Sequence, residues 1–255
     1  MVDISADAPI GAETDFTIGD ILGESLSILR RGYGKFFPLV AMFMLPDLIV
    51  QLLIAQSASS GSILSLTQAA SLGRFWSFAL SLLQTFAQVA VISGAFAYLS
   101  GQPLSIGDAW RSGSGRYGSA FRTAVLQGIG VLIGFVLLVV PGFIFLAMWY
   151  VALPVCVIEH RSATDSLNRS AALTKGHRWS VLGIMLVATV GGIALEAIAI
   201  ELADQIAGGI VSSFVDYVMQ IVVLSFAGIV GAVLFHRLRL AKEGPGVEML
   251  AEVFA

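Results

Sequence analysis

Residues 123–158 read TAVLQGIGVLIGFVLLVVPGFIFLAMWYVALPVCVI, a run without a single charged side chain. An apolar helix of about 20 residues crosses the hydrocarbon core of a bilayer, so this run is too long for one span and long enough for two short ones. Pro141-Gly142 divides it near the middle, and this dipeptide is a turn signal. We therefore predict two transmembrane helices, Thr123–Val140 and Phe143–Ile158, joined by a tight turn. The alternative is a single kinked helix.

The whole chain has the composition of a membrane protein. Of its 255 residues, 57% are hydrophobic and 12% are charged, whereas soluble domains average about 25% charged residues. The mean hydropathy is +0.88. Further apolar runs long enough to cross a bilayer are Phe36–Gln56, Phe75–Leu99, Trp179–Leu202 and Phe214–Phe235. Because helices satisfy their own backbone polar groups in lipid, the predicted fold class is an all-α polytopic membrane bundle with six transmembrane helices.

The basic residues distinguish the hairpin from the kinked helix. With six spans, 13 of the 14 Lys and Arg residues fall on one side of the membrane, and Arg74 is the exception. Since cytoplasmic loops are enriched in Lys and Arg, that side is predicted to be cytoplasmic, with both termini on it. A kinked helix would place Arg161, Arg169, Lys175 and Arg178 outside, so the hairpin is favoured.

The sequence around the spans defines the expected domain and excludes some partners. Residues 16–242 are predicted to form one membrane domain, flanked by a flexible N-terminal tail over 1–15 and a C-terminal tail over 243–255. A net charge of −3 without a basic stripe argues against nucleic-acid binding. Cys156 is the single cysteine, so no intramolecular disulfide can form, and it is expected to be a small buried hydrophobe.

Three segments that precede spans one, three and five resemble one another. They read Thr17-Ile18-Gly19-Asp20, Ser105-Ile106-Gly107-Asp108 and Ser162-Ala163-Thr164-Asp165. In each, Asp follows Ser or Thr by three positions, as in a capping box with Asp in place of Glu, and a basic and aromatic cluster follows. We predict short cytoplasmic interfacial helices and a threefold repeat of one such helix plus a hairpin. The alternative is that any cytoplasmic loop needs a cap and a basic anchor.

Polar side chains within the apolar spans form the first candidate site. Charged residues in the hydrocarbon core are costly and suggest function by default. The candidate intramembrane cluster is Asp47, Gln51, Gln84, Gln88, Glu196 and Gln220. It is either the lining of a path for a small polar molecule, ion or headgroup, or interhelical glue worth roughly 1 kcal/mol per hydrogen bond. Glue is the favoured interpretation. Gly130 and Gly134 form a GxxxG that permits close helix contact.

The second candidate site is a cytoplasmic interface of Glu159, Arg169, Lys175 and Arg178. Glu159 ends span four and is either a gate or partner contact or, as we favour, a carboxylate paired with Arg161, Arg169 or Arg178. Basic clusters near the inner leaflet attract anionic headgroups at about 1 kcal/mol per basic residue. No catalytic, cofactor-binding or metal-binding residue is predicted, because the sequence has no zinc-ligand spacing, Walker loop or G-x-S-x-G.

The segment Pro154–Trp179 resembles a known family. The motifs are Pro154-Val155-Cys156-Val157-Ile158-Glu159, Ser166-Leu167-Asn168-Arg169-Ser170 and Leu173-Thr174-Lys175-Gly176-His177-Arg178-Trp179, together with Pro141-Gly142 and the opening Phe16-Thr17-Ile18-Gly19-Asp20. They resemble the YciC-like family, also described as the glycerophosphoryl diester phosphodiesterase membrane domain. His160 and Ser166 depart from its pattern, which has Gly and Ala there. The resemblance implies a bacterial multi-pass inner-membrane protein of unassigned biochemistry. The phosphodiesterase barrel of some relatives is not expected, so no catalytic residue is carried over.

Two functions follow as expectations. The favoured one is a non-enzymatic membrane scaffold or accessory protein that contacts anionic lipid headgroups at the cytoplasmic face, a membrane protein partner, or a second copy of itself. The alternative is a small transporter or permease subunit in which Asp47, Glu196 and the glutamines line a polar path. A membrane-embedded enzyme is least favoured, because no two candidate groups lie at a catalytic spacing, and no cofactor is predicted.

Overall fold

A computed structural model describes residues 17–59, 66–101, 117–207 and 209–244, and the regular elements in these ranges are α-helices. They are α1 (Ile18–Ser59), α2 (Leu66–Leu99), α4 (Tyr117–Leu137), α5 (Val139–Trp149), α6 (Ala152–Ile158), α7 (Ala163–Leu173), α8 (Arg178–Ala207) and α9 (Gly209–Glu243). Within the same ranges, six helical stretches are long and apolar enough to cross a membrane, and α5 with α6 forms the fourth. The predicted all-α bundle with six membrane-spanning helices is confirmed.

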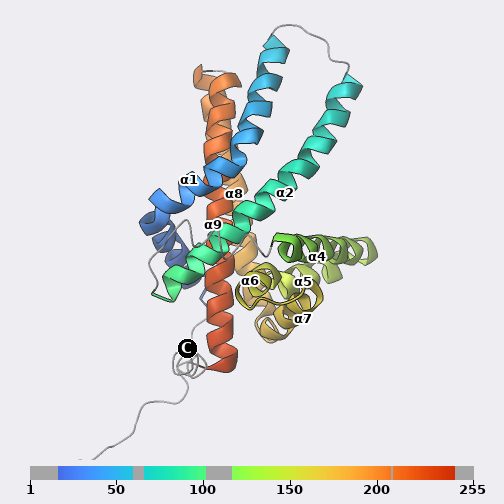
Figure 1. The fold of residues 1–255 in the computed structure, drawn as a ribbon, viewed down its shortest axis with the longest axis vertical. Coiled ribbons are helices and arrows are strands. Elements are labelled where there is room, and N and C mark those ends of the chain that lie inside the picture. Colours follow the sequence, from blue (N-terminus) through green and yellow to red (C-terminus); the bar gives the residue numbers. More distant parts are fainter. Residues whose placement is uncertain (1–16, 60–65, 102–116, 208, 245–255) are drawn as a thin grey trace, which may run out of the picture.

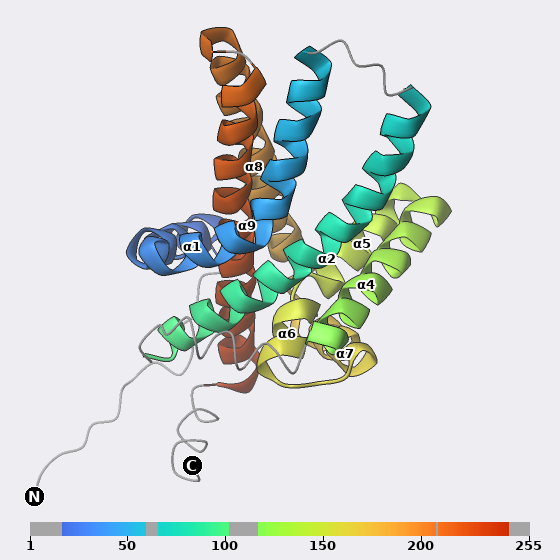
Figure 2. The same ribbon diagram turned by 45° about the horizontal axis from the view of Figure 1, so that its top comes forward.

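The helix α9 lies at the centre of the bundle, with α1, α2 and α8 packed against it (Figures 1 and 2). Its most extensive contact is with α1. Fully buried side chains such as Val40 and Met44 of α1 and Val233 and Leu234 of α9 belong to one core. Lipid is as apolar as these side chains, so close van der Waals packing rather than loss of water stabilises their contact.

The helix α1 is continuous from Ile18 to Ser59, so the first predicted interfacial helix is not a separate element. Its first half lies across the bundle, and its second half runs along α9 (Figures 1 and 2). Pro38 and Pro46 lie inside it, and proline bends a helix because it removes a backbone hydrogen bond. The apolar run begins at Phe36 as expected, but no helix begins or ends at that residue.

Both ends of the described chain meet where α1 and α9 cross. Arg237 of α9 donates to Glu24 of α1, with 2.6 Å between Nη2 and Oε2. The Nε of the same guanidinium lies 3.1 Å from the same oxygen. This ion pair adds a polar tie to the apolar packing between the first and the last helix.

The turn of the central hairpin lies at Leu138, so its predicted position at Pro141-Gly142 is wrong. Leu138 is extended, with φ −166° and ψ 151°, and it separates α4 from α5, which pack against each other. Pro141 falls in the first turn of α5. A first-turn N–H has no partner within the helix, so proline is tolerated there. The hairpin itself is present in place of the kinked helix.

Glycines allow α4 and α5 to approach closely. A Cβ added to Gly134 would lie 3.0 Å from the Cα of Gly142, and one added to Gly130 would overlap the ring of Trp149. The GxxxG of span three therefore packs the hairpin internally.

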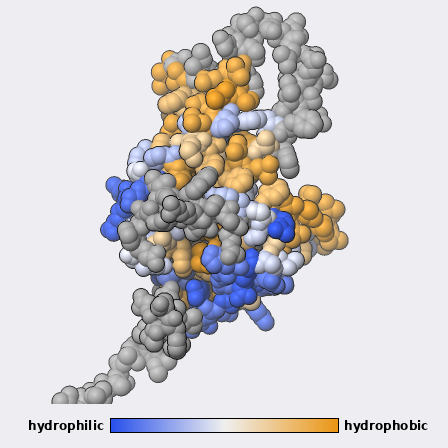
Figure 3. Space-filling model, in the orientation of Figure 1, coloured by the Kyte–Doolittle hydropathy of each residue, from blue (hydrophilic) through white to orange (hydrophobic). Residues whose placement is uncertain are grey.

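The tip of the hairpin presents an apolar surface. Its side chains between 62% and 78% exposed are Leu132, Val136, Leu137, Leu138, Val139 and Val140. Figure 3 shows hydrophobic surface over this region, whereas hydrophilic surface gathers over the lower part of the molecule, where α6, α7 and the end of α9 lie. An exposed apolar patch of this kind suits contact with lipid.

The third predicted interfacial helix is present as α7, and one half of its predicted capping box forms. The backbone N–H of Asp165 donates to Ser162 Oγ at 3.3 Å, while the Ser162 hydroxyl donates to Asp165 Oδ2 at 2.6 Å. The bond from Asp165 satisfies one backbone donor that a helix start leaves unpaired. The Asp165 carboxylate accepts from the Ser162 hydroxyl and not from its backbone N–H, so only the Ser162 half of the predicted capping box forms. The corresponding second segment, Ser105–Asp108, lies outside the described residues.

The helix α7 is attached to the end of α5 by hydroxyl groups. Ser170 Oγ and Thr174 Oγ1 donate to the carbonyl oxygen of Met148 at 2.8 Å and 3.3 Å. The last carbonyls of a helix lack intrahelical partners, and α5 ends at Trp149. The side chains of α7 therefore complete the C-terminus of a neighbouring helix.

Candidate functional site

Asp47 is a buried carboxylate whose two oxygens are both occupied by protein donors. It is 3% exposed. Gln51, one turn further along α1, donates from Nε2 to Oδ2 at 2.7 Å. Trp76 of α2 donates from Nε1 to Oδ1 at 2.9 Å. A buried carboxylate is costly unless it accepts such bonds, so these contacts join α2 to α1 at this position.

A second carboxylate, Asp216 of α9, extends the same set of contacts. Gln51 Nε2 also donates to Asp216 Oδ2, at 2.8 Å, and Gln220 Nε2 donates to that oxygen at 3.0 Å. Glu196 of α8 lies close enough to Asp216 for the two carboxyl groups to interact. Two neighbouring carboxylates repel each other, and a proton on one of them relieves that repulsion. We call this group of Asp47, Gln51, Trp76, Glu196, Asp216 and Gln220 the carboxylate cluster.

Four of the six residues predicted for the intramembrane site, Asp47, Gln51, Glu196 and Gln220, come together in the carboxylate cluster. The other two do not join it: within the described residues, Gln84 and Gln88 form no hydrogen bond with its members. Gln88 instead lines a separate cavity of about 170 Å³ with Gln127 and Tyr150.

The sequence prediction missed Asp216 and Trp76. Asp216 lies four positions before Gln220, so the one-turn spacing that pairs polar side chains on a helix face could have found it. Trp76 had no such signal, because an aromatic residue near a span end is an ordinary interfacial anchor.

The carboxylate cluster is suited to holding a proton and to joining helices. The donors that contact its carboxylates are two amides and one indole, all neutral. Among the described residues, no group of His, Cys, Asp and Glu side chains could hold a metal ion. The Oε1 atom of Gln220 is buried and has no hydrogen-bond partner within the described ranges, so one acceptor in the cluster is unsatisfied there.

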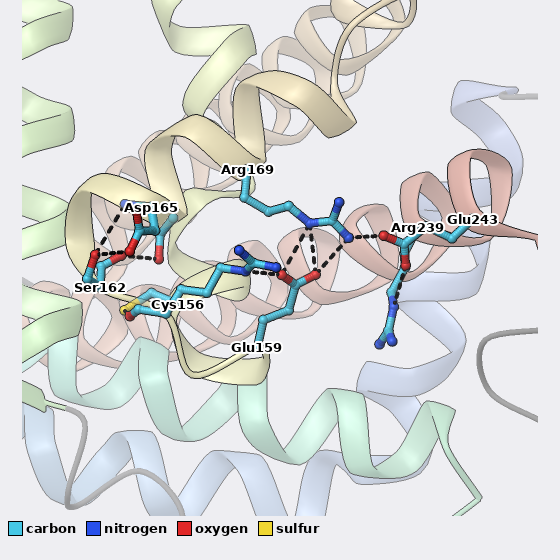
Figure 4. A network of polar contacts seen from close by, with 9 residues as sticks. Cys156, Glu159, Ser162, Asp165, Arg169, Arg239 and Glu243 are labelled. Atoms are coloured by element: carbon cyan, nitrogen blue, oxygen red, sulfur yellow. Dashed lines mark hydrogen bonds and ion pairs between the residues drawn. The ribbon is translucent and has the colours of Figure 1, made fainter. Parts of the chain in front are cut away.

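The second site is a network of ion pairs at the end of α9 (Figure 4). Glu159, after α6, accepts from Arg161 Nε at 2.6 Å and from Arg169 Nη2 at 3.1 Å. Arg169 also pairs with Glu243, which accepts from Arg239 Nε at 3.1 Å. Burial disfavours the charged guanidinium of Arg169, but Glu243 and Glu159 outweigh it and raise its pKa. This internal pairing is the favoured interpretation of Glu159.

The other two predicted interface residues lie away from these ion pairs. Lys175 is exposed. Arg178 begins α8 and lines a cavity of about 160 Å³ with Phe143, Ile144 and other apolar residues of α5 and α8. Its Nε is buried without a hydrogen-bond partner in the described part of the chain. The adjacent Trp179 is 77% exposed, so a cation and an aromatic ring flank one apolar hollow.

Comparisons with known proteins identify a family but not an activity. A family model described as a domain of unknown function (DUF7847) matches residues 32–242. This range contains the whole carboxylate cluster and the ion-pair network up to Arg239. None of the curated proteins and none of the solved structures matches the chain.

Proposed function

The chain belongs to the DUF7847 family, and on that premise we propose that it is a non-enzymatic membrane scaffold that binds anionic lipid headgroups through basic side chains at one membrane face. In this proposal that face is cytoplasmic, the membrane is the bacterial inner membrane, and the chain is related to the YciC-like proteins that Pro154–Trp179 resembles. A membrane protein partner or a second copy of the chain would use the same surface.

Arg178 is the observation that carries the proposal. Arg178 lines a mostly apolar cavity, its Nε has no acceptor in the described residues, and Trp179 beside it is exposed. Arginine pairs with phosphate through planar, charge-assisted hydrogen bonds. Trp favours the boundary between headgroups and hydrocarbon. A lipid with a phosphate headgroup would satisfy the cation and cover the apolar wall together.

The contacts of the carboxylate cluster favour a structural role in a scaffold rather than a conducting role in a channel. Both oxygens of Asp47 accept from the protein, and the residue is buried. The contacts of Gln51 connect α1 to α9. Polar side chains that pair with one another across helices act as interhelical glue.

Lipid titration of the purified protein tests the proposal. Native mass spectrometry in mild detergent would compare the binding of phosphatidylglycerol and phosphatidylcholine. We expect phosphatidylglycerol to bind more tightly, and Arg178→Gln to weaken it about fivefold, the equivalent of about 1 kcal/mol. Arg122→Gln is the matched control, because Arg122 Nε already donates to the carbonyl of Gly118 in its own helix. Equal binding of the two lipids would refute the proposal.

A second function, a proton-coupled transporter subunit, is favoured by the proximity of the Glu196 and Asp216 carboxyl groups within the apolar spans. Two carboxyl groups that lie close together repel each other when both are charged, so a proton held by one of them lowers this cost, and such a proton can be released and replaced. Proteoliposomes containing a trapped pH-sensitive dye would distinguish the two functions. A transporter collapses an imposed pH gradient and loses this activity in Glu196→Gln and Asp47→Asn without loss of folding. A scaffold shows no flux, and these variants change only its thermal stability.

A further inference from the structure

A cavity of about 380 Å³ lies between the first half of α1 and the middle of α9. Its lining residues are Leu29, Arg30, Tyr33, Phe37, Val222 and Ser225, and we call it the α1–α9 groove. Leu29, Tyr33 and Phe37 are spaced four residues apart, which places them on one face of α1. The groove is mostly apolar, with one cation and one buried hydroxyl in its lining. Its volume lies in the range of small-ligand sites.

Ser225 differs from several hydroxyl side chains elsewhere in the helices. Hydroxyl side chains within a helix can donate to the carbonyl four residues earlier, and Ser25, Ser93 and Thr123 all do so. Ser225 does not: it is 2% exposed, and its Oγ has no hydrogen-bond partner among the residues that the structure describes. An unsatisfied buried hydroxyl is destabilising. Because Ser225 lines the groove, an occupant with an acceptor oxygen would satisfy it.

The lining defines the chemistry of that occupant. Apolar walls disfavour a small soluble anion, and Arg30 disfavours a plain hydrocarbon. Tyr33, which is 53% exposed, has the amphipathic character typical of the headgroup boundary. A molecule that matches all these features has a hydrocarbon chain, a carbonyl oxygen next to it and an anionic phosphate beyond.

We propose that the α1–α9 groove binds one anionic glycerophospholipid. Its phosphate pairs with Arg30, its acyl ester carbonyl accepts from the Ser225 hydroxyl, and its acyl chain lies along Leu29, Phe37 and Val222. The proposal rests on the proposed function, since it assumes that the protein binds anionic lipid. It assigns that lipid to a built groove on a surface separate from the one at Arg178.

The test uses the full chain in mild detergent, titrated with phosphatidylglycerol or phosphatidylcholine and followed by native mass spectrometry. Arg30→Gln and Ser225→Ala should each weaken the tightest phosphatidylglycerol site about fivefold. Val222→Phe should fill the groove and remove that site. Ser93→Ala is the matched control for Ser225→Ala, because the Ser93 hydroxyl already donates to the Val89 carbonyl at 2.9 Å. It should leave lipid binding unchanged.

The outcomes separate this proposal from the proposed function. If Arg178→Gln weakens phosphatidylglycerol binding while the three groove variants do not, the groove proposal is overturned and the proposed function stands. If the wild type binds both lipids equally, both are overturned. Should Val222→Phe fail to fold, Ser225→Ala decides alone, because it removes one oxygen atom and leaves the helix intact. An unchanged lipid affinity in a folded Ser225→Ala protein overturns the role of the hydroxyl and with it the proposed lipid pose.

Discussion

Gln51 of α1 donates a hydrogen bond of 2.8 Å to Asp216 of α9, a residue 165 positions further along the sequence. The same nitrogen donates to Asp47 at 2.7 Å. One neutral amide therefore bridges two carboxyl groups on different helices. This bridge makes Gln51 the most informative position for a test of what the carboxylate cluster contributes.

Replacing Gln51 with Leu should lower the free energy of unfolding by about 1–3 kcal/mol, because it deprives two acidic side chains of a donor. Thermal unfolding in detergent would measure the loss. The control is Gln205→Leu, since Gln205 also donates to a carboxylate one turn earlier, Glu201, but at an exposed position. Its effect should stay within about 0.5 kcal/mol. Equal losses of unfolding free energy in the two variants would show that the Gln51 bridge stabilises the protein no more than an exposed hydrogen bond does.

Gly134→Ala should destabilise the hairpin of α4 and α5. The added methyl group would lie 3.0 Å from the Cα of Gly142, and backbone atoms cannot rotate away as a side chain can. We expect a loss of about 1–3 kcal/mol in detergent unfolding. Gly128→Ala in the same helix meets no atom within 4 Å, so it should be neutral or stabilising by up to about 1 kcal/mol. The reverse ranking would contradict the observed helix contact.

The ion pair between Arg169 and Glu243 should show a small coupling. Both side chains retain about a quarter of their exposure, 23% and 24%, so solvent screens the attraction. A double-mutant cycle with Arg169→Gln and Glu243→Gln should give about 0.5–1 kcal/mol. The coupling should fall as salt is raised, because ions screen exposed charges. A coupling that does not change with salt would point to hydrogen-bond geometry rather than charge.

The orientation of the chain can be tested with single cysteines on a Cys156→Ser background. The sequence places Ser60, between spans one and two, outside the cell, and Ser114, between spans two and three, inside it. A membrane-impermeant thiol reagent should therefore label Ser60→Cys in intact cells. It should reach Ser114→Cys only after permeabilisation. Labelling of both from one side would exclude the six-span topology, and the opposite pattern would invert it.

The sequence predicted the spans well because apolar length is a strong and local signal. All six predicted runs lie within or largely overlap helices that are long enough to cross a membrane. The boundaries were less predictable. At Leu138 an apolar residue forms the turn, and neither composition nor turn propensity marks it. The polar residues before Phe36 continue α1, because helical hydrogen bonding does not depend on hydropathy.

The candidate sites could be predicted in part, because a polar residue within an apolar run is also a local signal. Charge and polarity inside an apolar run single out Asp47, Glu196 and Gln220, and the structure brings them into one cluster. Which helices meet is a non-local property, so the separation of Gln88 from that cluster and the recruitment of Trp76 could not be derived from spacing. The groove beside Ser225 was likewise invisible, because serine in a helix is an ordinary residue until its hydroxyl lacks a partner.

The closure of α1 by α9 has a consequence for biosynthesis. During translation α1 is synthesised before α9. The hydrogen bond from Gln51 to Asp216 and the ion pair between Glu24 and Arg237 therefore cannot form until α9 has been made. While the helices between them are synthesised, Gln51 and Glu24 of α1 lack these two partners. A chain truncated before residue 209 would lack α9, so Gln51 and Glu24 would lose these two partners and α1 would lose its most extensive helix contact.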